Sequence, residues 1–325
     1  RKEWLMATHP HDEGFLPVQG GRIWYTVIDS GGRGLPLLCL HGGPGATHDY
    51  LEPLEQLASE RPVVFYDQLG SGKSERPDDA SLWTVERFVA ELATVREALG
   101  LEHLHLLGQS WGCMLAVEYL RRHGTDGVAG LILSAPYLST ARWVEDQWAY
   151  IAALPAETRA AIDRCERTGD FDNPDYAAAM AEFYRRHLCR LDPWPDCLQR
   201  TFAQMGLPVY QHMWGPSEFT VTGTLSGHEV GGLEALDLPV LLTCGRFDEA
   251  APATVDWFSQ RLPRARTVVF EDASHSHHLE KTEEYLAAVG AFLRENDGQA
   301  PETPPGTAAY SIGRPTLDVW RGMSR

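Results

Sequence analysis

Long apolar runs are absent from this sequence of 325 residues. No segment approaches the roughly 18 consecutive apolar residues that a helix needs to cross a bilayer. Residues 1–14 also lack the apolar stretch of a secretory signal. We therefore expect no membrane partner and a cytoplasmic location.

Basic residues are scarce relative to acidic ones. The chain has 28 Lys and Arg against 45 Asp and Glu, which gives a formal net charge of −17. Nucleic acids and anionic membranes are bound through basic patches, so this balance argues against both kinds of partner. It is compatible with a positively charged small ligand.

Cysteines are few, and their spacing indicates no pairing. In a chain of this length, such a pattern favours free, buried thiols in a reducing compartment over a disulfide framework. None of the six cysteines forms a CxxC pair, and several lie in apolar segments. The six are Cys39, Cys113, Cys165, Cys189, Cys197 and Cys244.

The sequence alternates between strand-like and helix-like segments. This alternation predicts an α/β fold, a mostly parallel sheet with helices on both faces. Short apolar runs typical of buried strands occur at residues 22–28, 37–40, 63–66, 104–107, 128–133, 239–243 and 267–270. Helical patterns occur at residues 84–99, 111–122, 253–262 and 282–295.

The pattern changes at residues 140–220, which have few β-branched runs and many aromatic residues. We predict a helical cap domain here, inserted into a core formed by residues 1–139 and 221–298, with residues 299–325 as a C-terminal extension. Most of the aromatic residues are expected to pack the cap, and a minority to line a pocket. The aromatic residues of this segment are Trp143, Trp148, Tyr150, Phe171, Tyr176, Phe183, Tyr184, Trp194, Phe202, Tyr210 and Trp214.

The strongest single motif is GQSWG at residues 108–112. It lies between a predicted strand and a predicted helix, which is the context of a nucleophile elbow. The turn is so tight that its flanking positions must be small, and Gly108 and Gly112 satisfy this requirement. We predict Ser110 as a nucleophile at a helix N-terminus, where backbone N–H groups can stabilise an oxyanion.

A serine hydroxyl needs a base, and the base needs an acid that orients it. In this kind of fold the three residues follow in the order Ser, Asp or Glu, His. Asp248 and His275 each follow a predicted strand, at the edge where open α/β sheets place their sites. We predict them as acid and base. The open alternatives are Glu249 and Asp272 for the acid, and His277 and His278 for the base.

The three histidines at positions 275, 277 and 278 have two further interpretations. One is a solvated loop. The other is a metal site, which we do not expect, because no carboxylate or thiol partners stand at a helical or hairpin spacing. The sequence therefore predicts neither a metal nor another cofactor.

A glycine-rich turn, HGGPG at residues 41–45, follows the predicted strand at residues 37–40. It lacks the Lys-Ser/Thr of a phosphate-binding loop, and one interpretation is a simple tight connection. Its place after an early central strand favours a second oxyanion donor, with the Gly43 N–H acting beside the Trp111 N–H.

Together these motifs resemble those of the proline iminopeptidases and related aminopeptidases and amino-acid amidases of the α/β-hydrolase superfamily. The resemblance covers residues 20–295. It implies an α/β-hydrolase fold with a helical cap after the sixth strand. It also implies Ser110, Asp248 and His275 as a catalytic triad, and the backbone of Gly43 and Trp111 as the oxyanion hole. The motifs are HGGPG, DQLGSGKS (67–74), GQSWGCMLAVEY (108–119), GPSEFTVTG (215–223), GRFDE (245–249) and ASHS (273–276).

The resemblance further implies that Glu218 and Glu249 hold the free α-amino group of the substrate. Such an ammonium, with a pKa of about 8, is charged at neutral pH. Burying it unpaired costs several kcal/mol, which two carboxylates offset. Without the resemblance, Glu218 is interpreted as a solvated cap residue and Glu249 as a charge at a helix N-terminus.

The implied function is removal of an N-terminal residue, proline or another small or apolar one, from a peptide or amide through an acyl-enzyme on Ser110. One alternative is an amidase, acting on amino-acid amides or releasing an aminoacyl group from a natural-product amide. The others are a carboxylesterase or lactonase on the same fold, and a non-catalytic binding protein. A homo-oligomer stays open, because apolar residues in the C-terminal extension could dock on a neighbouring subunit.

Overall fold

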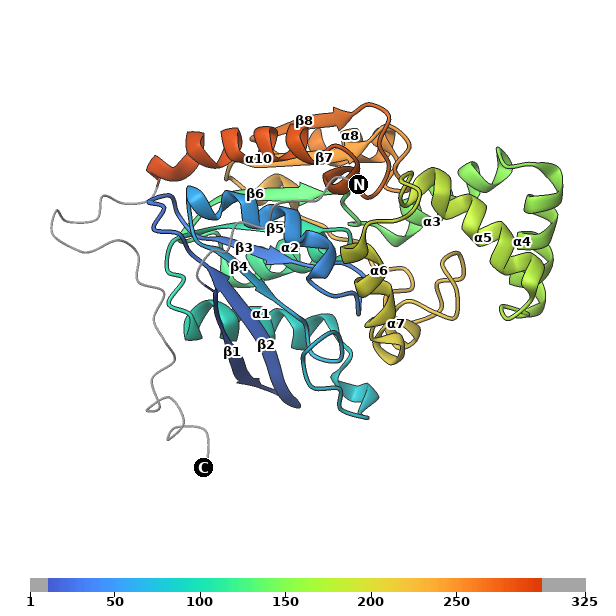
Figure 1. The fold of residues 1–325 in the computed structure, drawn as a ribbon, viewed down its shortest axis with the longest axis horizontal. Helices are drawn as coiled ribbons and strands as arrows, with labels where there is room; N and C mark the ends of the chain where they lie inside the picture. Colours follow the sequence, from blue (N-terminus) through green and yellow to red (C-terminus); the bar gives the residue numbers. More distant parts are fainter. Residues whose placement is uncertain (1–10, 300–325) are drawn as a thin grey trace, which may run out of the picture.

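The computed structural model describes residues 11–299 (Figure 1). Within them lies one sheet of eight strands in the order β1-β2-β4-β3-β5-β6-β7-β8. The β1–β2 and β2–β4 pairs are antiparallel, and all the others are parallel, which confirms the predicted α/β fold. The strands are β1 (His11–Val18), β2 (Gly21–Ile28), β3 (Leu37–Leu40), β4 (Val63–Tyr66), β5 (Leu104–Gln109), β6 (Val128–Ser134), β7 (Val240–Gly245) and β8 (Ala265–Phe270).

Alternate residues of the central strands pack into two separate cores, one on each face of the sheet. In β3, Leu38 and Leu40 belong to one core, and Leu37 and Cys39 belong to the other. Successive side chains of a strand point to opposite faces, so a strand covered on both faces is apolar throughout. One face carries α1 (Val85–Ala98), α2 (Trp111–His123) and α8 (Pro252–Ser259); the other carries a 3₁₀ segment (Asp49–Ser59) and α10 (Thr282–Asn296).

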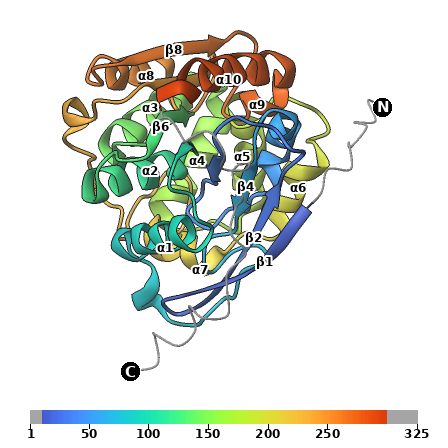
Figure 2. The ribbon, with the colours of Figure 1, turned by 90° about the vertical axis from the view of Figure 1, so that its left-hand side faces the viewer.

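The two edges of the sheet lie at opposite ends of the molecule. Figure 2 shows β8 with α8 and α10 at the top, and β1 with β2 at the lower right. The short helix α9 (His277–Glu280) lies between β8 and α10 in the chain. Helix ends follow local signals: the Thr84 side chain caps α1 by accepting from the Arg87 N–H.

Five cap helices lie between β6 and β7 in the chain. In Figure 1 they extend beyond one end of the strands, with α4 and α5 furthest from the sheet. The first three enclose a small core that includes Ile162 and Phe183. The boundaries at residues 140 and 220 stay a prediction, and residues 300–325 of the predicted extension lie outside the described residues. The helices are α3 (Thr140–Ala152), α4 (Ala156–Thr168), α5 (Pro174–His187), α6 (Asp196–Ala203) and α7 (Leu207–Met213).

All six cysteines are free thiols, and five of them are buried, as the sequence predicts. Among residues 11–299, no helix is both long and apolar enough to cross a membrane.

Candidate active site

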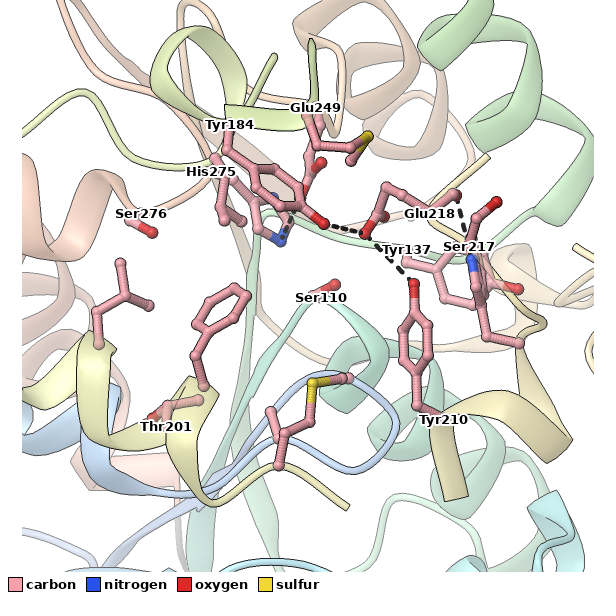
Figure 3. A pocket seen from close by; sticks show the side chains of 18 of the residues that line it. Ser110, Tyr137, Tyr184, Thr201, Tyr210, Ser217, Glu218, Glu249, His275 and Ser276 are labelled. Atoms are coloured by element: carbon pink, nitrogen blue, oxygen red, sulfur yellow. Dashed lines mark hydrogen bonds and ion pairs between the residues drawn. The ribbon is translucent and has the colours of Figure 1, made fainter. Parts of the chain in front are cut away.

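The candidate site is a cavity of about 410 Å³ whose walls come from both the cap and the sheet core. Ser110, Gly43, Glu218, Glu249 and His275 all contribute to its lining (Figure 3). The structure therefore brings together the residues that the sequence singled out for nucleophile, base, oxyanion donor and amine recognition.

Ser110 occupies a strained turn between β5 and α2. Its φ of 53° and ψ of −119° are rarely adopted by residues other than glycine. A Cβ on Gly108 would lie 2.3 Å from the Gly112 carbonyl oxygen, and one on Gly112 would lie 2.2 Å from the Leu40 carbonyl oxygen. Both flanking glycines are therefore required sterically. This geometry is that of a nucleophile elbow, which presents the Ser110 hydroxyl to the cavity.

The HGGPG turn packs directly against this elbow. A Cβ on Gly42 would lie 3.1 Å from the Ser110 Cβ. The next residue, Gly43, has a φ of 112° and lines the cavity. Trp111 is the first residue of α2, so its N–H has no acceptor within the helix. Backbone donors from two different segments thus lie next to the nucleophile.

Two residues outside the predicted set hold the HGGPG turn in place. The Tyr50 hydroxyl accepts from the Gly42 N–H at 2.8 Å. The Gln68 Nε2 donates to the His41 carbonyl oxygen at 2.9 Å, and Gln68 Oε1 accepts from Trp111 Nε1 at 2.9 Å. Gln68 belongs to the DQLGSGKS motif, so the sequence could have identified it. Tyr50 belongs to no motif, so nothing in the sequence pointed to it.

Asp248 and His275 form a buried pair. His275 Nδ1 donates to Asp248 Oδ1 at 2.7 Å. The carboxylate also accepts from the Ala250 N–H at 2.8 Å and the Gly245 N–H at 3.1 Å. Burial alone would raise the pKa of Asp248, but His275, assisted by His277, outweighs burial and lowers this pKa to about 2. Asp248 is therefore a carboxylate that fixes the imidazole and stabilises its protonated form.

The alternative acid and base residues have other environments. Asp272 is exposed. His278 Nε2 donates to the Tyr50 carbonyl oxygen at 3.0 Å, and burial lowers the pKa of His278 to about 3. His277 lies behind the pair, with Nδ1 3.6 Å from Asp248 Oδ2. Because all three histidines are buried, the interpretation of a solvated loop is wrong.

Glu218 approaches the cavity from the cap, and Glu249 approaches it from the core. The hydroxyls of Tyr184 and Tyr210 donate to Glu218 Oε2 at 3.2 and 3.3 Å. Glu249 Oε1 lies 3.5 Å from His275 Nε2, and its Oε2 has no hydrogen-bond partner among residues 11–299. Burial raises the pKa of both carboxyls. Two acids that line one cavity, Glu249 buried and Glu218 half-buried, form a site that favours a cation.

The nucleophile and the base share the cavity, but within the described chain no hydrogen bond joins them. Figure 3 shows the Ser110 hydroxyl below His275, and the imidazole linked instead to Glu249. Burial lowers the pKa of His275, but Glu249 and Asp248 outweigh it and raise the pKa to about 9. The two flanking carboxyls therefore favour the protonated form of the imidazole.

Cap helices hold the two loops that carry these groups. From α3, Gln147 Nε2 donates to the Glu249 carbonyl oxygen at 2.8 Å, and the Tyr150 hydroxyl donates to the Asp248 carbonyl oxygen at 2.9 Å. The His275 N–H donates to the carbonyl oxygen of His187, the last residue of α5, at 2.9 Å. The cap therefore positions the site as well as covering it. No sequence motif indicated these contacts.

The cap aromatics contribute more to the cavity than the sequence suggested. The expectation that only a minority line a pocket is wrong, because cap and core meet there along a broad apolar wall. Seven of the eleven aromatic residues named above line the cavity, namely Trp143, Phe171, Tyr176, Tyr184, Phe202, Tyr210 and Trp214.

The fold and the elbow define an α/β hydrolase, and residues 36–282 match the family model of the alpha/beta hydrolase fold. The chain is 43% identical to a proline iminopeptidase of Heyndrickxia coagulans, over 87% of this chain and 99% of that one. A crystal structure of proline iminopeptidase from Mycobacterium smegmatis aligns with a TM-score of 0.84 and 41% identity, covering 89% of this chain and all of that one. The protein VinJ aligns with a TM-score of 0.83 and 36% identity, covering 88% and 99% of the two chains.

These similarities extend through the cap as well as the core. The chain therefore belongs to the proline iminopeptidase family of the α/β hydrolases, as the motifs indicated.

Proposed function

We propose that this protein is a serine aminopeptidase that removes an N-terminal proline, or another small or apolar residue, from peptides with a free α-amine. The observation that carries the proposal is the pair Glu218 and Glu249, two acids that face one cavity with Ser110 and His275, Glu249 buried and Glu218 half-buried. An esterase or lactonase does not need such a pair, because its substrates need not carry an ammonium group.

The amine site explains the release of a single residue. An N-terminal proline carries a secondary ammonium with two N–H donors, which matches one donor for each carboxylate. Fixing that nitrogen leaves only the adjacent carbonyl within reach of Ser110. Aromatic rings suit the pyrrolidine ring of proline. The ring centroids of Tyr137 and Trp214 lie 5.2 Å apart, and both residues line the cavity.

In the proposed reaction His275 takes the proton of Ser110 while the hydroxyl oxygen attacks the carbonyl of the N-terminal residue. The Gly43 and Trp111 N–H groups stabilise the oxyanion. His275 then protonates the leaving amine, and Asp248 stabilises the imidazolium in each half-reaction. Water, deprotonated by His275, releases the acyl group. No metal or organic cofactor takes part in these steps.

We place this activity in the cytoplasm, since free thiols are typical of a reducing compartment. The substrate is a small peptide, and neither nucleic acid nor membrane binding is part of the proposal.

A fluorophosphonate probe tests the nucleophile. The probe should label Ser110, identified by mass spectrometry of the modified peptide, and a Ser110→Ala variant should not react. A panel of aminoacyl-arylamides tests the specificity, with prolyl-arylamide expected among the best substrates. An unlabelled but folded protein would support a binding function, and a labelled protein that turns over only esters would support an esterase.

A further inference from the structure

We propose that Glu249 controls the base as well as binding the substrate amine. In the free enzyme it holds His275 as an imidazolium, and the arriving substrate ammonium takes the place of that imidazolium. At neutral pH, His275 becomes a base only when a free α-amine is bound. The proposal rests on the function proposed above and extends it, because it assigns amine recognition a part in the chemical step.

The imidazole of His275 lies between two carboxylates. Its Nδ1 is 2.7 Å from Asp248 Oδ1, and its Nε2 is 3.5 Å from Glu249 Oε1. A ring with an acid on each side is most stable when both nitrogens carry hydrogen. Nε2 is also the atom that must accept the Ser110 proton, so the contact with Glu249 competes with catalysis.

The described part of the chain offers no Lys or Arg in the cavity lining to neutralise the two glutamates, Glu218 and Glu249, which both face the cavity. Among the described residues, no other cationic side chain near His275 lines the cavity. His278 is kept neutral by burial, His277 faces the far side of Asp248, and the neighbouring ring is Trp143 at 5.7 Å. In the free enzyme, the His275 imidazolium is therefore the counter-ion of Glu249.

A substrate ammonium changes this balance. It offers Glu249 a better-placed donor, and its positive charge repels the imidazolium across the same small cavity. The imidazolium proton then passes to solvent, and neutral His275 can accept the proton of Ser110. An N-blocked peptide cannot displace the imidazolium, so it is rejected in the chemical step as well as in binding.

The decisive experiment compares an amine-free ester with the peptide substrate in the full-length protein. For p-nitrophenyl acetate, the pH profile of kcat/KM should have its acid limb near the His275 pKa of about 9. Glu249→Gln should move that limb down by one to two pH units, and so raise the ester rate at pH 7 by roughly tenfold or more. The same variant should lower the turnover of prolyl-arylamide.

Glu249→Asp retains the carboxylate, so its acid limb should stay closer to that of the parent enzyme than to that of Glu249→Gln. A purely structural role for Glu249 would instead lower both activities in both variants, without a shift of the acid limb.

Proton release provides a second readout that does not depend on ester turnover. A Ser110→Ala variant titrated with prolinamide at pH 7.5, in buffers of different ionisation enthalpy, should release close to one proton for each ligand bound. Adding Glu249→Gln should abolish most of this release. An unshifted ester profile together with no proton release would overturn the proposal. Failure of the proposed function would look different, because prolyl-arylamide would not be hydrolysed at all.

Discussion

Glu218→Gln is the substitution that isolates amine binding from the chemical step. In the parent protein, Glu218 Oε2 accepts from two tyrosine hydroxyls. The amide oxygen of glutamine can accept the same hydrogen bonds, so the loop that carries residue 218 should keep its place. Losing one of the two charges that face a desolvated ammonium should cost about 2–4 kcal/mol of substrate binding. That corresponds to a fall of roughly 30- to 1,000-fold in kcat/KM.

The fall should appear mainly in KM, because Glu218 binds the amine equally in the ground and transition states. Glu249→Gln should also raise KM, and it should differ by moving the acid limb of the pH profile downward. Steady-state kinetics with prolyl-arylamide measure both parameters. Glu157→Gln, an exposed glutamate on α4, is the matched control and should leave them unchanged.

Stability provides the check on folding. Burial raises the pKa of Glu218, so its carboxylate is not a source of stability in the free protein. The free energy of unfolding of Glu218→Gln should therefore equal or exceed that of the parent. A well-folded variant whose kcat/KM changes by less than about threefold would refute the amine site.

Three further predictions concern other parts of the molecule. Tyr184→Phe removes one hydroxyl from Glu218 and should lower kcat/KM about three- to tenfold, measured with prolyl-arylamide; an unchanged value would show that the hydrogen bond has no effect on the amine site. Gly112→Ala should yield little folded protein, since its Cβ would meet backbone at 2.2 Å; normal thermal unfolding would contradict this. Asp297→Asn should cost about 2 kcal/mol in denaturant titrations at pH 7, because His105 and Arg61 outweigh burial and hold the pKa of Asp297 well below its usual range. This contribution is present above the unfolded pKa of about 3.9 and is lost as the pH falls through the folded value, so the difference between parent and variant should shrink in acid.

The central strands were predictable because they are covered on both faces. Two-sided burial makes every residue of β3 apolar, and this shows in the sequence as a continuous run. The edge strand β1 was missed for the opposite reason. Only Leu16 of its eight residues is buried, so it leaves neither an apolar run nor a clear alternation.

The chain order of the site residues was also accessible, since Ser110, Asp248 and His275 each follow a strand that the sequence identifies. The contacts that arrange them were not. Tyr184 on α5 reaches Glu218, and Gln147 on α3 reaches the loop of Glu249, in each case across more than 30 residues and from a helix to a loop. Such contacts depend on how the cap sits over the sheet, which no local pattern encodes. The contact of Glu249 with His275 likewise depends on the packing of two loops.

The most direct test of the account compares prolyl-arylamide with its N-acetyl derivative on the same enzyme. Both present the same carbonyl and the same leaving group, and they differ only in the charge that Glu218 and Glu249 are proposed to bind. We predict a kcat/KM for the acetylated substrate at least about 1,000-fold lower, because it offers neither acid a positive charge. Values within about tenfold of one another would contradict the claim that this serine hydrolase recognises a free α-amine.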